Sequence, residues 1–329
     1  MLVLELRSRF RDLSALVVGD ICLDRWCHYD PDLAQPSRET GIPRLAVTWT
    51  EITPGAGGTV ANNLAALCVR RIAVLGVTGD DGSGYELRQA LEARNIEHDL
   101  LVKQPGWTTF TYTKIINENT NIEDHPRLDF IAPFVLPKEA EEELLSNFRR
   151  VASEFDVILV SDQAETERGG VVGAALRLEL ERHAAENPAK IIWVDSRMRA
   201  ELFRKVIVKV NEEEANAACM RAFGEVDFDQ LRDLTEAPVL LVTHGGDGVT
   251  LIDSYGELLI ETTKVDNPVD ICGAGDSFSA GAAMAFCATG YAEAAAKFGN
   301  AVAAVTIMKP GTGTASWLEL MAVENDSVH

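Results

Sequence analysis

Short runs of consecutive apolar residues recur along the chain, and longer segments with helical spacing separate them. Within these runs apolar residues do not alternate with polar ones, which is typical of strands covered on both faces. We therefore predict strands over residues 15–19, 72–77, 157–161, 191–195, 206–210 and 239–243.

The segments between these runs place apolar residues three and four positions apart, as an amphipathic helix does. In the first of them Val60, Leu64 and Leu67 fall on one face. Helices are predicted over residues 58–69, 85–93, 138–152, 171–186, 213–223, 228–234, 276–289 and 291–308. Alternation of strands and helices predicts an α/β fold, in which helices cover both faces of a mainly parallel sheet.

Two segments, about 24–53 and 107–131, depart from this alternation. Their prolines, threonines and aromatic residues in short alternating pieces are typical of antiparallel strands. We predict that both segments form one small β-sheet, inserted in a single domain that spans residues 1–329. Such a sheet over the strand ends would be a lid that excludes water from a reaction. The alternative is an extra sheet edge or a dimer contact alone.

Charge and composition narrow the class of protein. The chain has 30 Lys and Arg against 51 Asp and Glu, a formal net charge of −21. This argues against binding to nucleic acid or to an anionic membrane, although a few local cations would still admit a phosphorylated substrate. No apolar run is long enough for a transmembrane helix. Six cysteines without a C-x-x-C pair indicate free thiols and a cytoplasmic protein.

The strongest chemical signal is the segment Asp270-Ile-Cys272-Gly273-Ala274-Gly275-Asp276, which leads into a predicted helix. Glycines allow a close backbone approach, and the amides at the start of a helix attract an anion. Asp276 in that first turn is placed to accept a proton from a hydroxyl that attacks a bound phosphate. A helix cap behind a structural turn is the alternative.

Two further segments carry candidate binding residues. Gly57 and Gly58 open a predicted helix that contains Asn62, and this segment fits neither a dinucleotide fingerprint nor a Walker A loop. An asparagine there can donate and accept hydrogen bonds with sugar hydroxyls. Asp20 and Asp24 follow the first strand, where open α/β sheets bind ligands. A tight turn and solvated loop acids are the alternatives.

These motifs together resemble the ribokinase, or PfkB-type, family of sugar kinases. Residues 270–276 resemble its D-[TI]-x-G-A-G-D signature, and Gly57, Gly58 and Asn62 resemble its N-terminal signature. Asn211-Glu-Glu-Glu214 is similar to the family N-x-x-E, and residues 243–248 are similar to its T-x-G-x-x-G loop. The four motifs follow the family order over most of the chain.

The resemblance implies a ribokinase-like α/β/α core with a β-sheet lid and a role for each matching residue. Asp276 would be the catalytic base, with the amides of Gly273, Ala274 and Gly275 around the transferred phosphoryl group. The other implied roles form three groups. The sugar would be bound by Asp20, Asp24, Gly57, Gly58, Asn62, Lys114 and Arg127. ATP would be bound by Thr243, Gly245, Gly248 and Asn300. Asn211 and Glu214 would hold Mg²⁺ through water, and Asp270 and Cys272 would contribute to a K⁺ site.

Within the family the chain is most similar to the heptose 7-phosphate kinases. Residues 37–43 and 163–168 depart from that subgroup near the expected sugar pocket, so the acceptor stays open. Ribose, a fructose phosphate or a nucleoside are alternative acceptors, and a non-catalytic sugar- or nucleotide-binding protein is a further alternative. We also expect a homodimer paired through the lids, without the nucleotidyltransferase domain of bifunctional relatives.

Overall fold

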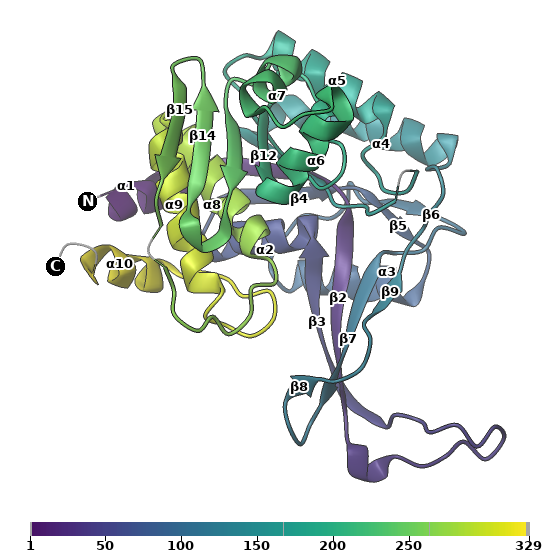
Figure 1. The fold of residues 1–329 in the computed structure, drawn as a ribbon. Helices are drawn as coiled ribbons and strands as arrows, with labels where there is room; N and C mark the ends of the chain where they lie inside the picture. The colour runs from purple at the N-terminus through teal and green to yellow at the C-terminus, as the bar shows by residue number, and fades with distance from the viewer. Residues whose placement is uncertain (1, 167, 263, 327–329) are drawn as a thin grey trace.

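The computed structural model describes residues 2–166, 168–262 and 264–326. Its centre is an eight-stranded sheet in the order β15-β14-β13-β12-β11-β10-β1-β4 (Figure 1). The strands are β1 (Ser14–Gly19), β4 (Arg71–Leu75), β10 (Val157–Asp162), β11 (Ile191–Ser196), β12 (Ile207–Asn211), β13 (Leu240–Thr243), β14 (Val249–Asp253) and β15 (Gly256–Ile260). Pairing is parallel from β4 to β13 and antiparallel for β14 and β15, so the prediction of a mainly parallel sheet is confirmed.

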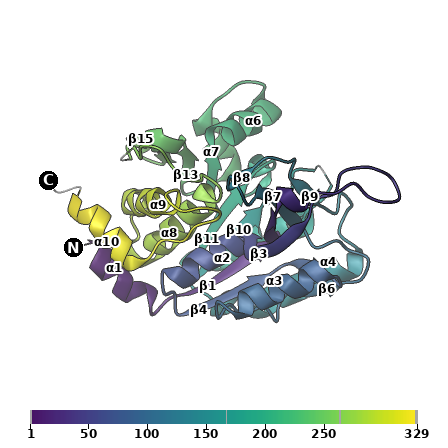
Figure 2. The same ribbon diagram turned by 90° about the horizontal axis from the view of Figure 1, so that it is seen from below.

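Helices cover both faces of this sheet, as predicted (Figures 1 and 2). Successive residues of β1 point to opposite faces, so Ala15 and Val17 pack in one core and Leu16 and Val18 in the other. The first core contains residues from α1 (Leu2–Phe10), α2 (Gly57–Ala66), α3 (Gly82–Glu92), α8 (Ala274–Thr289), α9 (Ala292–Thr306) and α10 (Trp317–Asp326). The second contains residues from α4 (Lys138–Val151), α5 (Ala174–Glu186), α6 (Glu212–Phe223) and α7 (Phe228–Thr235).

Some elements differ from the sequence prediction. The run over 72–77 does not continue as one strand, because Gly76 lies where a Cβ would come 2.5 Å from the Gly19 carbonyl oxygen. After Gly76, β5 (Val77–Gly79) pairs with β6 (Val102–Gln104) in a separate sheet. The helix predicted from residue 171 begins at Ala174. The elements α1, α10, β14 and β15 were not predicted, and short 3₁₀ turns occur at Pro31–Leu33, Ala152–Glu154, Ala200–Leu202 and Gly245–Asp247.

The two segments outside the α/β alternation pair in one sheet. It consists of β2 (Ile21–Tyr29), β3 (Val47–Ala56), β7 (Thr111–Asn117), β8 (Ile122–Glu123) and β9 (Leu128–Phe130). β2 pairs antiparallel with β3 but parallel with β7, which the alternating pattern did not predict. Because β2 starts two residues after β1 ends, this second sheet extends directly from the carboxyl ends of the main strands (Figure 1).

Candidate active site

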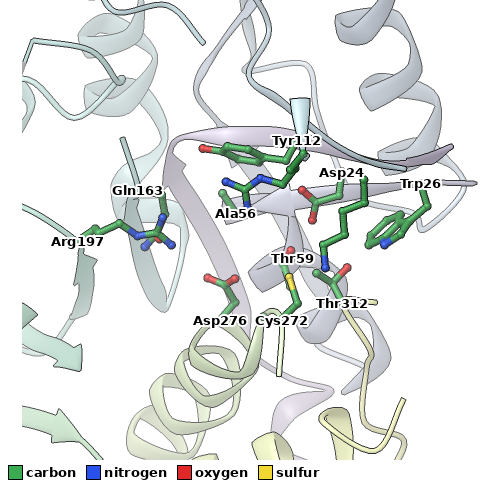
Figure 3. A pocket seen from close by; sticks show the side chains of 13 residues that line it. Asp24, Trp26, Ala56, Thr59, Tyr112, Gln163, Arg197, Cys272, Asp276 and Thr312 are labelled. Carbon is green, nitrogen blue, oxygen red and sulfur yellow. The ribbon is translucent and has the colours of Figure 1, made fainter. Parts of the chain in front are cut away.

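A pocket lies between the start of α8 and the second sheet, at the carboxyl ends of the main strands (Figure 3). We call it the central pocket. It is lined by Asp24, Trp26, Ala56, Thr59, Tyr112, Lys114, Arg127, Gln163, Arg197, Cys272, Gly273, Asp276 and Thr312. Five of the residues predicted from the sequence as site residues are therefore brought together with Cys272, which the sequence assigned to a cation site.

The glycine turn before α8 has the geometry that its sequence predicts. Gly273 adopts a φ of 76°, in the left-handed region that favours glycine, and α8 has no side-chain cap. One oxygen of Asp270 accepts the Cys272 N–H at 2.9 Å, and the other accepts the Gly311 N–H at 3.2 Å. The two hydrogen bonds of Asp270 thus fix the turn, while the first N–H groups of α8 remain available to an anion.

Asp276, at the start of α8, lies across the central pocket from Asp24 and Tyr112 of the second sheet (Figure 3). Burial and, to a lesser extent, the nearby charge of Asp195 raise the pKa of its carboxyl to about 8. Lys209 and Arg197 act in the opposite direction. A carboxyl with this pKa can take up a proton near neutral pH, as a general base must.

Sequence reasoning missed a buried ion pair beneath the turn. Lys209 of β12 contacts Asp195 of β11, with 2.8 Å between Nζ and Oδ2, and Ser279 donates to the same Oδ2 at 3.0 Å. A Cβ added to Gly275 would come 2.9 Å from Lys209 Nζ, so the ammonium lies directly against the glycine turn. Burial lowers the pKa of Lys209, but Asp195 and Glu214 outweigh it and raise the pKa overall. Lys209 therefore carries a positive charge where a bound phosphate would gather negative charge.

The second sheet contributes an acid, two cations and two aromatic rings to the central pocket. Burial raises the pKa of Asp24 to about 7, although Lys114 and Arg127 oppose this. The Lys114 ammonium lies 3.8 Å from Asp270 Oδ2, and Arg127 stacks on the Tyr112 ring at 5.0 Å. Trp26 gives the pocket an apolar wall.

Asp20 lies behind the pocket wall and does not line the pocket. One of its oxygens accepts the Gln163 and Ala164 N–H groups, and the other accepts the Val171 N–H. Burial raises its pKa to about 6. Asp20 therefore holds both ends of the 163–171 loop, and Gln163 of this loop lines the pocket.

Gly57, Gly58 and Asn62 also lie outside the pocket lining. An added Cβ would come 2.7 Å from Ile21 Cδ1 at Gly57 and 2.6 Å from Pro54 Cβ at Gly58. The glycines thus allow α2 to pack closely against β2 and β3. Asn62 Oδ1 accepts a hydrogen bond from Arg94 Nε at 2.9 Å. In this structure α2 contributes Thr59 to the pocket instead.

A second, outer pocket adjoins the same glycine turn and has a volume of about 420 Å³. It brings together the predicted residues Thr243, Gly245, Gly248 and Asn300 with Ala274 and Gly275. Ile271, Phe278 and Ile307 give it an apolar side. Asn300 Nδ2 is buried without a hydrogen-bond partner in the described structure, which suits a polar ligand atom. Gly273 lines one pocket and Ala274 and Gly275 line the other, so the turn lies between the two pockets.

Asn211 and Glu214 cap α6 reciprocally. Asn211 Oδ1 accepts the Glu214 N–H at 2.8 Å, and Glu214 Oε2 accepts the Asn211 N–H at 2.8 Å. Burial and Asp195 raise the pKa of Glu214. Its Oε1 has no hydrogen-bond partner among the described residues and is free for a hydrated cation. No cluster of three or more potential ligands (His, Cys, Asp or Glu) capable of holding a metal ion occurs within residues 2–166, 168–262 and 264–326.

The fold and the two pockets define a phosphotransferase-type site: an α/β sheet with an anion-binding helix start between two ligand pockets and a carboxyl of raised pKa. The family model for pfkB family carbohydrate kinases matches residues 14–319. The chain therefore belongs to the pfkB family of carbohydrate kinases.

Curated relatives and solved structures agree with this assignment. The chain is 28% identical over 325 residues to the bifunctional protein HldE of Geobacter metallireducens, covering 96% of this chain and 64% of the relative. A Nitrobacter winogradskyi protein of the same name is 28% identical over 322 residues, again covering 96% of this chain and 64% of the relative. The chain thus spans less than two thirds of these relatives' length.

Two solved structures share the fold over nearly their whole length. Ribokinase from Thermotoga maritima has a TM-score of 0.71 and 22% identity, covering 95% of this chain and 99% of the other. Phosphofructokinase-2 from Escherichia coli in complex with potassium has a TM-score of 0.73 and 18% identity, covering 96% and 100%. The expected ribokinase-like fold is confirmed. None of the described helices is long and apolar enough to cross a membrane.

Proposed function

We propose that this chain transfers the γ-phosphate of ATP to a hydroxyl of a phosphorylated sugar bound in the central pocket. The observation that carries the proposal is the set of three cations, Lys114, Arg127 and Arg197, which line that pocket near Asp276. A phosphate on the acceptor would be matched by such cations in a chain whose net charge is −21. The leading acceptor is D-glycero-β-D-manno-heptose 7-phosphate, from the subgroup resemblance.

The other arginines weighed from the sequence lie elsewhere. Arg25 forms an ion pair with Glu86, and Arg199 forms one with the buried Asp162. Arg38 and Arg44 are exposed on the 30–46 connection of the second sheet. Lys114, Arg127 and Arg197 also have acidic partners, namely Glu123 and Asp270, Asp129, and Glu165. They differ from the other arginines because they line the central pocket, where an acceptor phosphate would share them with these carboxylates.

In the proposed mechanism Asp276 accepts the proton of the attacking hydroxyl. The N-terminus of α8 and the Lys209 ammonium stabilise the negative charge of the phosphoryl group from the side of the turn. Trp26 and Tyr112 pack against the apolar face of the sugar, and Asp24 accepts hydrogen bonds from its hydroxyls. The second sheet closes the pocket as a lid and excludes water.

We propose that ATP binds in the outer pocket, with Thr243, Gly245, Gly248 and Asn300 around the nucleotide. Mg²⁺ would neutralise charge on the phosphates, and Glu214 and Asn211 would hold it through water. For K⁺, Asp270 and the Cys272 carbonyl offer the oxygen ligands of such a site. Each Asp270 oxygen accepts one N–H group, which leaves it a lone pair for a cation.

The test is an ADP-release assay with ATP and Mg²⁺, in potassium and in tetramethylammonium buffer. The acceptors are heptose 7-phosphate, fructose phosphates, ribose, free hexoses and nucleosides, and Asp276→Asn is the inactive control. Turnover restricted to phosphosugars would support the proposal. Turnover on ribose or nucleosides alone would contradict it while keeping a kinase. Acceptor binding with no turnover on any acceptor would favour a non-catalytic binding protein.

Arg197 allows a sharper test of the phosphate in the acceptor. Arg197→Ala should raise the KM for the phosphosugar about 10- to 100-fold, the value of a charge-assisted hydrogen bond. The KM for ATP should not change. Arg25→Ala is the matched control, because Arg25 lies on β2 beside Asp24 but pairs with Glu86 outside the pocket. Equal effects of the two substitutions would argue against a phosphate subsite at Arg197.

We further propose that two copies pair through the second sheet. Its edge strand β3 exposes Val47 and Trp49, and β9 exposes Leu128 and Phe130. Exposed apolar side chains on sheet edges favour pairing with another chain. Light scattering should give a dimer for the wild type and a monomer for Trp49→Asp. Tyr255→Asp, at an exposed turn between β14 and β15, should remain dimeric.

A further inference from the structure

A third cavity is lined by residues of the 163–171 loop that do not line the central pocket, among them Arg168, Gly169 and Gly170. Its volume is about 480 Å³, and we call it the rear cavity. Its charged lining consists of Arg168, Arg177, Arg199, Arg221, Glu141 and Glu201. Four arginines against two glutamates give a local positive excess in a chain that is strongly acidic overall. No role in the proposed reaction uses this cavity.

Two of the four arginines are already neutralised by the protein. Arg199 forms an ion pair with Asp162 and donates from Nη1 to the Gly169 carbonyl oxygen at 3.3 Å. Arg221 forms a bidentate ion pair with Glu201, with 2.7 Å between Nε and Oε1 and 2.9 Å between Nη2 and Oε2. These two side chains build the wall of the cavity, so its available positive charge comes from Arg168 and Arg177.

Arg177 is half-buried, and no carboxylate of the described residues lies within ion-pair distance of it. Its Nη1 donates to the Val172 carbonyl oxygen at 2.9 Å, and its guanidinium lies 5.9 Å from the Phe203 ring centre. Burial lowers the pKa of Arg177. The charges of Asp162 and Glu201 offset this effect only in part, so an anion in contact with the guanidinium would stabilise its charged form further.

The backbone beside Arg177 also favours an anion. Helix α5 begins at Ala174, and no side chain caps its first turn. Its N-cap residue, Gly173, lines the cavity together with Glu141. Glu141 is the acidic group nearest to it, because a Cβ added to Gly173 would come 3.1 Å from Glu141 Oε1. Glu141 forms no ion pair with Arg177 and is only partly buried, so it leaves the guanidinium available.

We propose that the rear cavity binds the phosphate group of a small anionic ligand, held by Arg177 and Arg168 at the start of α5. The site is distinct from both pockets of the proposed reaction and does not depend on that reaction. It shares one element with the central pocket, since Gly169 and Gly170 line the rear cavity and Gln163 of the same loop lines the central pocket.

The test is calorimetric titration of the full chain with inorganic pyrophosphate and, separately, with fructose 1,6-bisphosphate, each with ADP and Mg²⁺ at saturation. Arg177→Met should weaken binding at least tenfold, and Arg168→Met should weaken it less. Arg182→Met is the matched control, because Arg182 lies on α5 but pairs with Glu179 and Glu186. Its affinity should equal that of the wild type.

The two titrants distinguish an inorganic ligand from an organic phosphate, and an Arg177-dependent affinity for either supports the site. Circular dichroism and the melting temperature report whether Arg177→Met folds. If it does not, the exposed Arg168 decides the outcome. The proposal is overturned if a folded Arg177→Met, or Arg168→Met in its place, binds both titrants as the wild type does. It is equally overturned if the wild type binds neither at millimolar concentration.

Discussion

Asp276 holds its proton more tightly than an ordinary aspartate, because the surrounding protein desolvates its carboxyl and Asp195 adds a negative charge nearby. A carboxyl of this kind can exchange a proton with a sugar hydroxyl, which a strongly acidic aspartate does poorly. We predict that Asp276→Asn lowers kcat by about 10²- to 10⁴-fold, the usual contribution of a general base. Calorimetry should show an unchanged Kd for ATP. Near-wild-type turnover would remove Asp276 from the base role.

The residues around Asp276 predict a pH dependence with a definite sign. A base must be deprotonated to act, so kcat/KM should rise with pH and level off above about 8, the pKa of Asp276. Asp195→Asn removes a charge that raises this pKa, and it keeps an acceptor for Lys209 and Ser279. The rise should therefore move to lower pH in Asp195→Asn.

Lys209→Met should move the same rise to higher pH, because the ammonium favours the charged form of Asp276. It should also lower stability by about 3–5 kcal/mol, since it leaves Asp195 buried without its partner. Profiles of kcat/KM against pH for the wild type and the two variants check both shifts. Shifts in the same direction would contradict this account of the electrostatics.

At the level of residues, local chemistry could be predicted from the sequence and distant contacts could not. The turn at Gly273 and the place of Asp276 in the central pocket follow from adjacent glycines, a carboxylate and a helix start. Lys209 was missed because the strand over residues 206–210 was predicted from its apolar residues alone, without regard to the one charged residue among them. A lysine inside a strand buried on both faces was nevertheless the available signal, because such a charge needs a buried partner.

The loop over residues 163–171 shows how one buried side chain positions an element. Three backbone N–H groups of this loop donate to Asp20. Asp20→Asn keeps the size of the side chain but replaces one acceptor oxygen with a donor. We predict an acceptor KM raised about tenfold through Gln163, with the KM for ATP unchanged, which steady-state kinetics would measure. Asp12→Asn, outside both pockets, is the control. Equal KM values for wild type and Asp20→Asn would show that the loop keeps its position without Asp20.

Element boundaries could be predicted where one pattern dominates. The continuous apolar runs predicted six strands, and five of these extend as strands over most of the predicted residues. The sixth is interrupted at Gly76 by the close approach of the Gly19 carbonyl, a contact 57 residues away in sequence. The parallel pairing of β2 with β7 could not be predicted either, because the connecting chain, and not the alternation of side chains, determines the relative direction of two strands.

At the scale of the whole molecule, the buried carboxyl groups of the site lower the free energy of unfolding at neutral and higher pH. The pKa values of Asp24 and Asp276 lie at about 7 and about 8, well above the ordinary value near 3.8. The folded chain therefore keeps protons that the unfolded chain loses above about pH 4. The stability that these protons contribute is complete below pH 4 and is lost as pH rises through 7 and 8. Bound cations and phosphates would offset this cost in the loaded enzyme.

The ligand-free protein should therefore melt at a higher temperature at pH 5 than at pH 8. Asp24→Asn removes one of these acids, so it should raise stability at pH 8 by about 1–3 kcal/mol and change it little at pH 5. Denaturant unfolding at both pH values measures the difference. Asp253→Asn, at the far end of β14, should show no such dependence. A loss of stability in Asp24→Asn at pH 8 would instead mean that Lys114 and Arg127 hold Asp24 ionised in the free protein.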